Sequence, residues 1–179
     1  LRKRTKVGFG SGKIEDGVVE KCAAYAAREH GDARRAIDLL RVAGELAERD
    51  NEKKVCVGHL DIAEDKIEKD RIVESVTRQP RQVQAVLFAI FQTDESDRKI
   101  MFTGEVYTCY NEVCAKVGLR PLTQRRVSDV IGELDMLGII NARVISKGRY
   151  GRTREISIPL HEQMVSHLSG LLQDALLYT

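Results

Sequence analysis

Apolar residues recur at intervals of three and four along most of the chain, the spacing that places them on one side of an α-helix. Gly31 is expected to end the first helix, and Asp32 is the expected N-cap of the second. The third helix is highly charged, and a break is expected in it near Lys69–Asp70. In the first part of the chain, the predicted helices cover residues 18–30, 33–49 and 58–78.

The same spacing continues beyond Pro80, which is suited to the first turn of a helix containing Val83 to Phe91. Thr103 is the expected N-cap of the next helix, which ends at Gly118. Thr123 is the expected N-cap of the one after, which ends at Gly138. The period then changes from 3.6 to 2. Two strands are predicted over 139–146 and 154–158, with a turn over 147–153 between them and a last helix over 162–177.

Three helices followed by a β-hairpin are typical of a winged helix, which is a helix-turn-helix with an added wing. The predicted fold class is therefore mainly α. We expect an all-helical unit over residues 1–68 and a winged-helix unit over residues 69–179, which combines three helices, a β-hairpin wing and a C-terminal helix.

Composition adds little to this picture. The formal net charge is only +2 and the apolar fraction is 42%, which is ordinary for a globular protein. The four cysteines form no C-x-x-C pair and the four histidines show no ligand spacing, so we expect reduced thiols and no metal site. No apolar run is long enough to cross a bilayer. Reduced thiols are typical of a cytoplasmic protein. Since the chain begins with Leu1 and not with Met, we also expect a piece of a longer protein.

The predicted wing concentrates positive charge at its turn. Lys147, Arg149, Arg152 and Arg154 occur there without an acidic residue. Gly148 and Gly151 let the backbone approach a surface closely, and Tyr150 offers a ring for stacking or insertion. This composition favours contact with phosphates or with a narrow minor groove of DNA. The alternative is a solvated basic loop.

The third helix of the winged helix begins with a second group of candidate DNA-binding residues. Gln124, Arg125 and Arg126 precede its first apolar position. Glutamine and arginine can each form two hydrogen bonds to the edge of one base. Thr123 offers its hydroxyl to a phosphate. Alternatively, Arg126 forms an ion pair with Asp129 or Glu133.

Arg34 and Arg35 begin the helix over 33–49, although the N-terminal end of a helix disfavours cations. An anion beyond the helix would make them favourable there, because guanidinium groups bind phosphates in a bidentate manner. Alternatively, both pair with carboxylates nearby in the sequence, which are Glu29, Asp32 and Asp38.

The stretch AAREHGDARRAIDLLRVAGELAER resembles the sensor-2 helix of AAA+ ATPases, in particular that of archaeal replication initiators of the origin-recognition and cell-division-control family. The resemblance continues through IEKDRIVESV, TGEVYTCYNEVCAKVGLRPLTQRRVSDVIGELDMLGII and SKGRYGRTREISI, and thus covers nearly the whole chain. It implies that residues 1–68 are an AAA+ lid and that residues 69–179 bind origin DNA.

The resemblance also implies roles for particular residues. Arg34 would reach the γ-phosphate of ATP, bound with Mg²⁺ by another domain of the longer protein, whereas Arg35 would be structural. The DNA-binding residues would be Gln124–Arg126 and Lys147–Thr153. In the longer protein the implied partners are double-stranded origin DNA and the replicative helicase, and the implied location is the nucleoid.

The chain lacks the parts that hydrolyse ATP in this family. GFGSGK, from Gly8 to Lys13, is not a phosphate-binding loop: the required first glycine would fall at Val7, and Ile14 follows the lysine. We therefore expect no catalytic residue and no bound cofactor in this chain alone. One alternative is a winged-helix transcription regulator, which would leave the helix with the G-D-x-R pattern at residues 31–34 unexplained. The other is a protein-interaction module, which would not bind duplex DNA.

Overall fold

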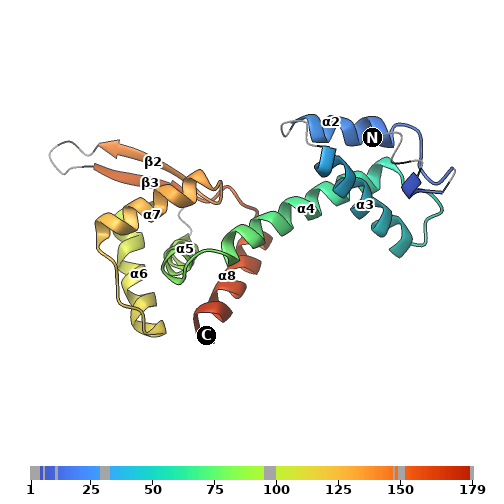
Figure 1. Cartoon of the computed structure of the whole chain (residues 1–179). Helices are drawn as coiled ribbons and strands as arrows, with labels where there is room; N and C mark the ends of the chain where they lie inside the picture. Colours follow the sequence, from blue (N-terminus) through green and yellow to red (C-terminus); the bar gives the residue numbers. More distant parts are fainter. Residues whose placement is uncertain are drawn as a thin grey trace. The chain divides into compact units, whose positions relative to one another are not determined.

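The computed structural model describes residues 5, 7–10, 12–28, 33–94, 100–146, 148 and 152–177. The chain divides into two compact units, Leu1–Arg71 and Ile72–Thr179. Among the described residues the elements are α2 (Val18–Arg28), α3 (Ala33–Arg49), α4 (Val57–Thr77), α5 (Arg81–Asp94), β1 (Met101–Phe102), α6 (Thr103–Val117), α7 (Gln124–Met136), β2 (Asn141–Ser146), β3 (Arg152–Ser157) and α8 (Glu162–Leu177). Helices make up most of the chain, as predicted (Figure 1).

The first unit buries the apolar faces of α2, α3 and the first part of α4 against one another. At the centre of this core are Val18, Cys22, Leu39, Ala43, Leu60 and Ala63, all fully buried. On the surface, Lys21 of α2 donates a hydrogen bond of 2.9 Å to Asp61 of α4. The hydroxyl of Tyr25 donates to the same carboxylate. The hydrogen bonds from Lys21 and Tyr25 lower the pKa of Asp61.

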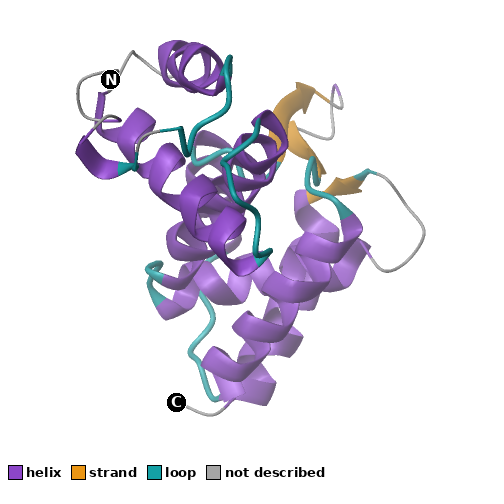
Figure 2. Cartoon of the chain, turned by 90° about the vertical axis from the view of Figure 1, so that its right-hand side faces the viewer, coloured by secondary structure: helices purple, strands orange, loops and turns teal. Residues whose placement is uncertain are grey.

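The second unit is built around α5, in which every residue from Val83 to Phe91 is buried. A helix that is apolar all round belongs in the middle of a core. The sheet is antiparallel, in the order β1-β3-β2. It is small beside the helices of this unit, as Figure 2 shows. Three helices followed by a hairpin and a C-terminal helix confirm the predicted winged helix.

Two local predictions were wrong, and the first concerns α4. This helix is continuous from Val57 to Thr77, with no break at Lys69–Asp70, because neither glycine nor proline interrupts it beyond Gly58. The sequence pattern also did not reveal β1, because a strand of two residues is too short to show an alternation. The expected helix stop at Gly31 and N-cap at Asp32 lie outside the described residues.

Thr103 is also not an N-cap. Phe102 occupies that position, and its backbone N–H donates to the carboxylate of Glu105 at 2.8 Å. The hydroxyl of Thr103 instead accepts a hydrogen bond of 3.1 Å from the backbone N–H of Arg154. This happens because β1 ends at Phe102, so that Thr103 takes over the pairing of β3 one residue further on.

None of the four cysteines is in a disulfide, and two of them, Cys22 and Cys114, are buried. Within the described ranges, no helix has the length and apolar character that a membrane crossing requires. Nor do the described residues contain a group of three or more histidine, cysteine or acidic side chains arranged to hold a metal ion.

Candidate nucleic-acid interface

The start of α7 presents polar side chains to solvent. Thr123 is its N-cap, as predicted, and the hydroxyl accepts a hydrogen bond from the backbone N–H of Arg126 at 3.4 Å. Gln124, Arg125 and Arg126 are exposed, and the first turn contains no acidic residue. The opposite side of the helix is buried through Val127, Val130, Ile131 and Leu134. Because the apolar side of α7 is buried in the core, its polar side with Gln124 and Arg125 faces the solvent.

The loop that precedes α7 is held by buried hydrogen bonds. The hydroxyl of Tyr110, on α6, accepts from the backbone N–H of Leu122 at 3.0 Å and donates to the side-chain oxygen of Gln82. Burial raises the pKa of Tyr110 to about 12. The hydroxyl of Tyr107 donates to the Leu122 carbonyl at 3.2 Å. Leu122 is thus fixed on both sides, one residue before the N-cap of α7.

The hairpin of β2 and β3 is called the wing below. One of its faces is buried against the core at one end and exposed to solvent at the other. Ala142 pairs with Ile156, Val144 with Arg154 and Ser146 with Arg152. Because side chains alternate along a strand, these six side chains share one face. Ile156 is fully buried, whereas Arg152 is exposed, so this inner face runs from the core to the solvent. Figure 1 shows α7 beside the wing.

An open depression of about 520 Å³ lies between the start of α7 and the inner face of the wing. Three arginines and a single carboxylate give it a net positive charge. Its lining residues are Thr103, Gln124, Arg125, Ser128, Asp129, Val144, Arg152, Thr153 and Arg154. Guanidinium groups beside amide, hydroxyl and apolar side chains can bond phosphates and read base edges.

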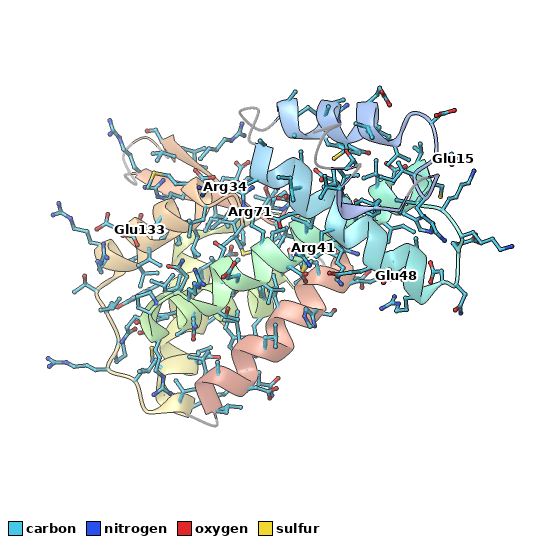
Figure 3. The ribbon with its side chains drawn as sticks, turned by 45° about the vertical axis from the view of Figure 1, so that its right-hand side comes forward. Glu15, Arg34, Arg41, Glu48, Arg71 and Glu133 are labelled. Carbon is cyan, nitrogen blue, oxygen red and sulfur yellow. The ribbon has the colours of Figure 1, made fainter. Side chains whose placement is uncertain are left out.

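Four of the predicted site residues come together in this depression: Gln124, Arg125, Arg152 and Thr153. Arg126 instead forms an ion pair with Glu133, at 3.0 Å (Figure 3 labels Glu133), which is one of the two alternatives that the sequence left open. Gly148 is exposed with a φ of 61°, a conformation that glycine tolerates. The predicted wing residues Lys147, Arg149, Tyr150 and Gly151 lie outside the described residues.

Five lining residues were missing from the predicted site, and one of them, Thr103, had been assigned to a helix end instead. Ser128 and Asp129 follow Gln124 and Arg125 by one helical turn, and this spacing was the available signal. Val144 is 56% exposed on β2, although a strand pattern alone favours burial of valine. Arg154 had been noted only as part of the basic turn. Its Nε donates to the hydroxyl of Ser128 at 3.3 Å.

At the second predicted site, at the start of α3, two neighbouring arginines have different surroundings. Arg34 is exposed on a first turn that contains no acidic residue (Figure 3), which fits a role in binding a phosphate. Arg35 is 13% exposed and pairs with Glu64 at 2.9 Å and with Glu68 at 3.7 Å, both on α4. Its partners are therefore distant in sequence, unlike the carboxylates considered from the sequence.

The segment from Gly8 to Lys13 does not lead into a helix. The Lys13 carbonyl accepts from the N–H of Val55 at 2.9 Å, and Ile14 forms a parallel bridge with the same residue. The next described helix begins only at Val18. A phosphate-binding loop would place the helix directly after the lysine.

Comparison with known proteins gives two family matches. Residues 1–65 match the family described as the Cdc6 AAA+ ATPase-type lid domain. Residues 74–167 match the family described as the CDC6 C-terminal winged helix domain.

Individual relatives are also similar. An ORC1-type DNA replication protein of Thermococcus onnurineus is 52% identical over 168 residues, which are 94% of this chain and 40% of the relative. One of Pyrococcus horikoshii is 54% identical over 158 residues, which are 88% of this chain and 38% of the relative. The solved structure of the Aeropyrum pernix ORC1 protein in complex with DNA has a TM-score of 0.81 and 43% identity, and covers 99% of this chain and 47% of that one.

Proposed function

The chain belongs to the archaeal ORC1/Cdc6 family of replication proteins, and from this premise we propose that it binds the duplex DNA of replication origins through the depression between α7 and the wing. In this proposal α7 is the recognition helix. Gln124 and Arg125 contact base edges, while Arg152 contacts a phosphate. Thr123, Arg126 and the wing residues Lys147–Gly151 remain predicted contacts.

The observation that carries the proposal is the convergence of Gln124, Arg125 and Arg152 from two elements onto one open, positively charged depression. Arg125 and Arg152 come from different elements and line one depression, although like charges repel. A polyanion bound in the depression would attract both arginines and so offset their mutual repulsion. The relative of known structure was crystallised with DNA, which supports the same conclusion.

Selection from a random duplex library, followed by binding titrations, tests this function. The chain should bind its selected duplex more tightly than a scrambled duplex of the same composition. Replacing Gln124 with alanine should reduce that preference, since a bidentate base contact contributes about 1–3 kcal/mol of discrimination. Equal affinity of the wild-type chain for the selected and scrambled duplexes would rule out sequence-specific binding.

The lid unit supports a second part of the proposal, which concerns the longer protein. The chain spans 40% of the Thermococcus onnurineus relative, so a nucleotide-binding domain would come from outside it. Arg34 would bind the γ-phosphate of ATP there, and bound ATP with Mg²⁺ would supply the phosphoryl group for hydrolysis. Coupling to the replicative helicase and association with the nucleoid would follow from origin binding.

Arginine substitutions in the full-length protein test this role. Arg34→Ala should lower ATP turnover because a guanidinium contact with the transferred phosphate is lost. Arg41→Ala is the matched control, since Arg41 is an exposed arginine of the same helix that pairs with Glu45 at 2.7 Å. Unchanged turnover in Arg34→Ala, or equal losses in both variants, would contradict the assignment.

A further inference from the structure

We propose that Arg154 is a positioning residue that fixes the wing against the recognition helix, and that the absence of a side chain at Gly132 of α7 leaves room for its guanidinium. This inference rests on the proposed function, because the spacing that Arg154 sets matters only if α7 and the wing bind the same duplex. It adds a specificity-determining contact that lies beneath the DNA-binding surface.

Arg154 lies where the inner face of the wing changes from buried to exposed. Its neighbours on that face are Ile156, which is fully buried, and Arg152, which is exposed. Arg154 itself is half-buried. Its backbone N–H donates to the hydroxyl of Thr103 at 3.1 Å, at the start of α6. Its Nε donates to the hydroxyl of Ser128 at 3.3 Å, on α7. One residue therefore joins β3 to both helices.

Gly132 lies one turn after Ser128 on α7, and the guanidinium of Arg154 occupies the space beside it. A Cβ atom at position 132 would lie 3.1 Å from Nη2 of Arg154 and 3.5 Å from its Cζ. Glycine inside a helix is destabilising relative to alanine. Gly132 has ordinary helical backbone, so no left-handed conformation requires it. The guanidinium of Arg154 therefore lies against the face of α7 that Gly132 leaves open.

The consequence concerns the distance between Arg152 and the start of α7. A binding site that contacts a rigid ligand from two elements needs its groups held to within about 0.5 Å, and neighbouring residues must provide that support. Arg154 is two residues from Arg152 on the same face of β3, and Ser128 is one turn from Gln124. Without the contacts of Arg154, the side chains of Arg152 and Gln124 would still be present, but the distance between them would no longer be fixed.

Arg154 also lines the depression, so it has to be distinguished from a simple phosphate contact. A substitution at Gly132 makes this distinction, because it displaces the guanidinium while leaving the charge in the chain. Leucine is the better choice, since the Cβ of alanine alone would require only a small shift of a flexible side chain. Gly170→Leu is the matched control: Gly170 is a helical glycine on α8 with no atom within 4 Å of an added Cβ.

The experiment measures the affinity of the full chain for its selected duplex and for a scrambled duplex, together with the melting temperature and the salt dependence of binding. Gly132→Leu should lower the ratio of the two affinities at least about fivefold, the lower limit for one misplaced bidentate base contact. The affinity for the scrambled duplex and its salt dependence should be unchanged, as should the melting temperature. Gly170→Leu should retain the wild-type ratio.

A double-mutant cycle completes the test. In an Arg154→Ala background, Gly132→Leu should cause no further loss of discrimination, because the side chain that it displaces is already absent. An unchanged ratio in Gly132→Leu, or losses that add in the double variant, would overturn the positioning role while the proposed function stands. A wild-type chain that does not distinguish the two duplexes would instead overturn the proposed function.

Discussion

Arg34 and Arg35 are neighbours in sequence but have different surroundings. Arg34 is exposed on the first turn of α3, whereas Arg35 turns inward and meets two carboxylates of α4. A mostly buried ion pair stabilises a fold chiefly because removal of one partner leaves the other charge unpaired. The positive charge of Arg35 is thus part of the packing of the first unit, whereas Arg34 is exposed.

Substitution by methionine, which keeps an unbranched, flexible stem but removes the guanidinium and its charge, should distinguish the roles of the two arginines. We expect Arg35→Met to lower the free energy of unfolding by about 3 kcal/mol, because Glu64 loses its partner. Arg34→Met should change it by less than about 0.5 kcal/mol, as is usual for an exposed position. Denaturant titrations of the chain measure both values, and equal effects would contradict the division of roles.

Asp129 is the carboxylate in a depression that otherwise carries arginines. A negative charge near a phosphate weakens binding to any DNA sequence, but a carboxylate can accept a hydrogen bond from the amino group of cytosine. If the depression binds DNA as proposed, Asp129 should limit non-specific binding.

Asp129→Asn should increase affinity for a scrambled duplex. Removal of a repulsion of about 1 kcal/mol corresponds to about a fivefold gain at low salt, which should shrink as salt screens the charge. Glu112→Asn is a suitable control, since Glu112 is exposed on α6 and is not among the residues that line the depression. If Asp129→Asn left non-specific affinity unchanged at every salt concentration, the carboxylate would not face the bound DNA.

Between elements, the geometry of the site depends on a buried hydroxyl. Tyr110 is fully buried and holds the loop before α7 through its hydrogen bonds to Leu122 and Gln82. The orientation of α7 relative to α6 is therefore fixed just before the N-cap of α7, and not only by the apolar side of that helix.

Tyr110→Phe removes one oxygen atom and leaves the Leu122 N–H without that acceptor. We expect a loss of about 1–3 kcal/mol in the free energy of unfolding, the usual cost of an unsatisfied polar group away from water. Tyr107→Phe is the control: its hydroxyl bonds the carbonyl of the same residue, but the tyrosine is only half-buried. A loss no larger in Tyr110→Phe than in Tyr107→Phe would contradict this account of the loop.

Helices were predictable because the burial of one face shows in the sequence of each helix alone. The N-cap Thr123 and the stops at Gly118 and Gly138 were predictable for the same local reason. The hydroxyl of Thr103 was assigned to a helix end because the sequence does not show that a two-residue strand precedes it. The sequence thus predicts features that depend on neighbouring residues, and it does not predict those that depend on a distant strand.

The site was predictable only in part. The residue types at the start of α7 and in the wing indicated nucleic acid, and Gln124, Arg125 and Arg152 do converge. The contact from Arg154 to Ser128 joins residues 26 positions apart, and no spacing rule connects them. Gly132, inside an otherwise regular helical pattern, was the one signal of a close approach.

At the scale of the whole molecule, the two units carry different chemistry. The first presents Arg34 at a helix start, and the second presents a cationic depression between a helix and a wing. The central claim is that this depression, and not basic charge in general, binds DNA. A net charge of only +2 makes the claim testable, because the chain as a whole does not act as a polycation.

The most direct test is the dependence of DNA affinity on salt concentration, plotted on logarithmic axes for one duplex. The double variant with Arg125→Ala and Arg152→Ala should have a slope shallower than that of the wild type by at least about 0.9, because the phosphate neutralised by Arg152 loses its partner. Arg143→Ala removes an arginine from the outer face of the wing, where it pairs with Glu155 at 3.1 Å, and should keep the wild-type slope. A wild-type slope in the double variant, or an equal reduction in Arg143→Ala, would contradict the account.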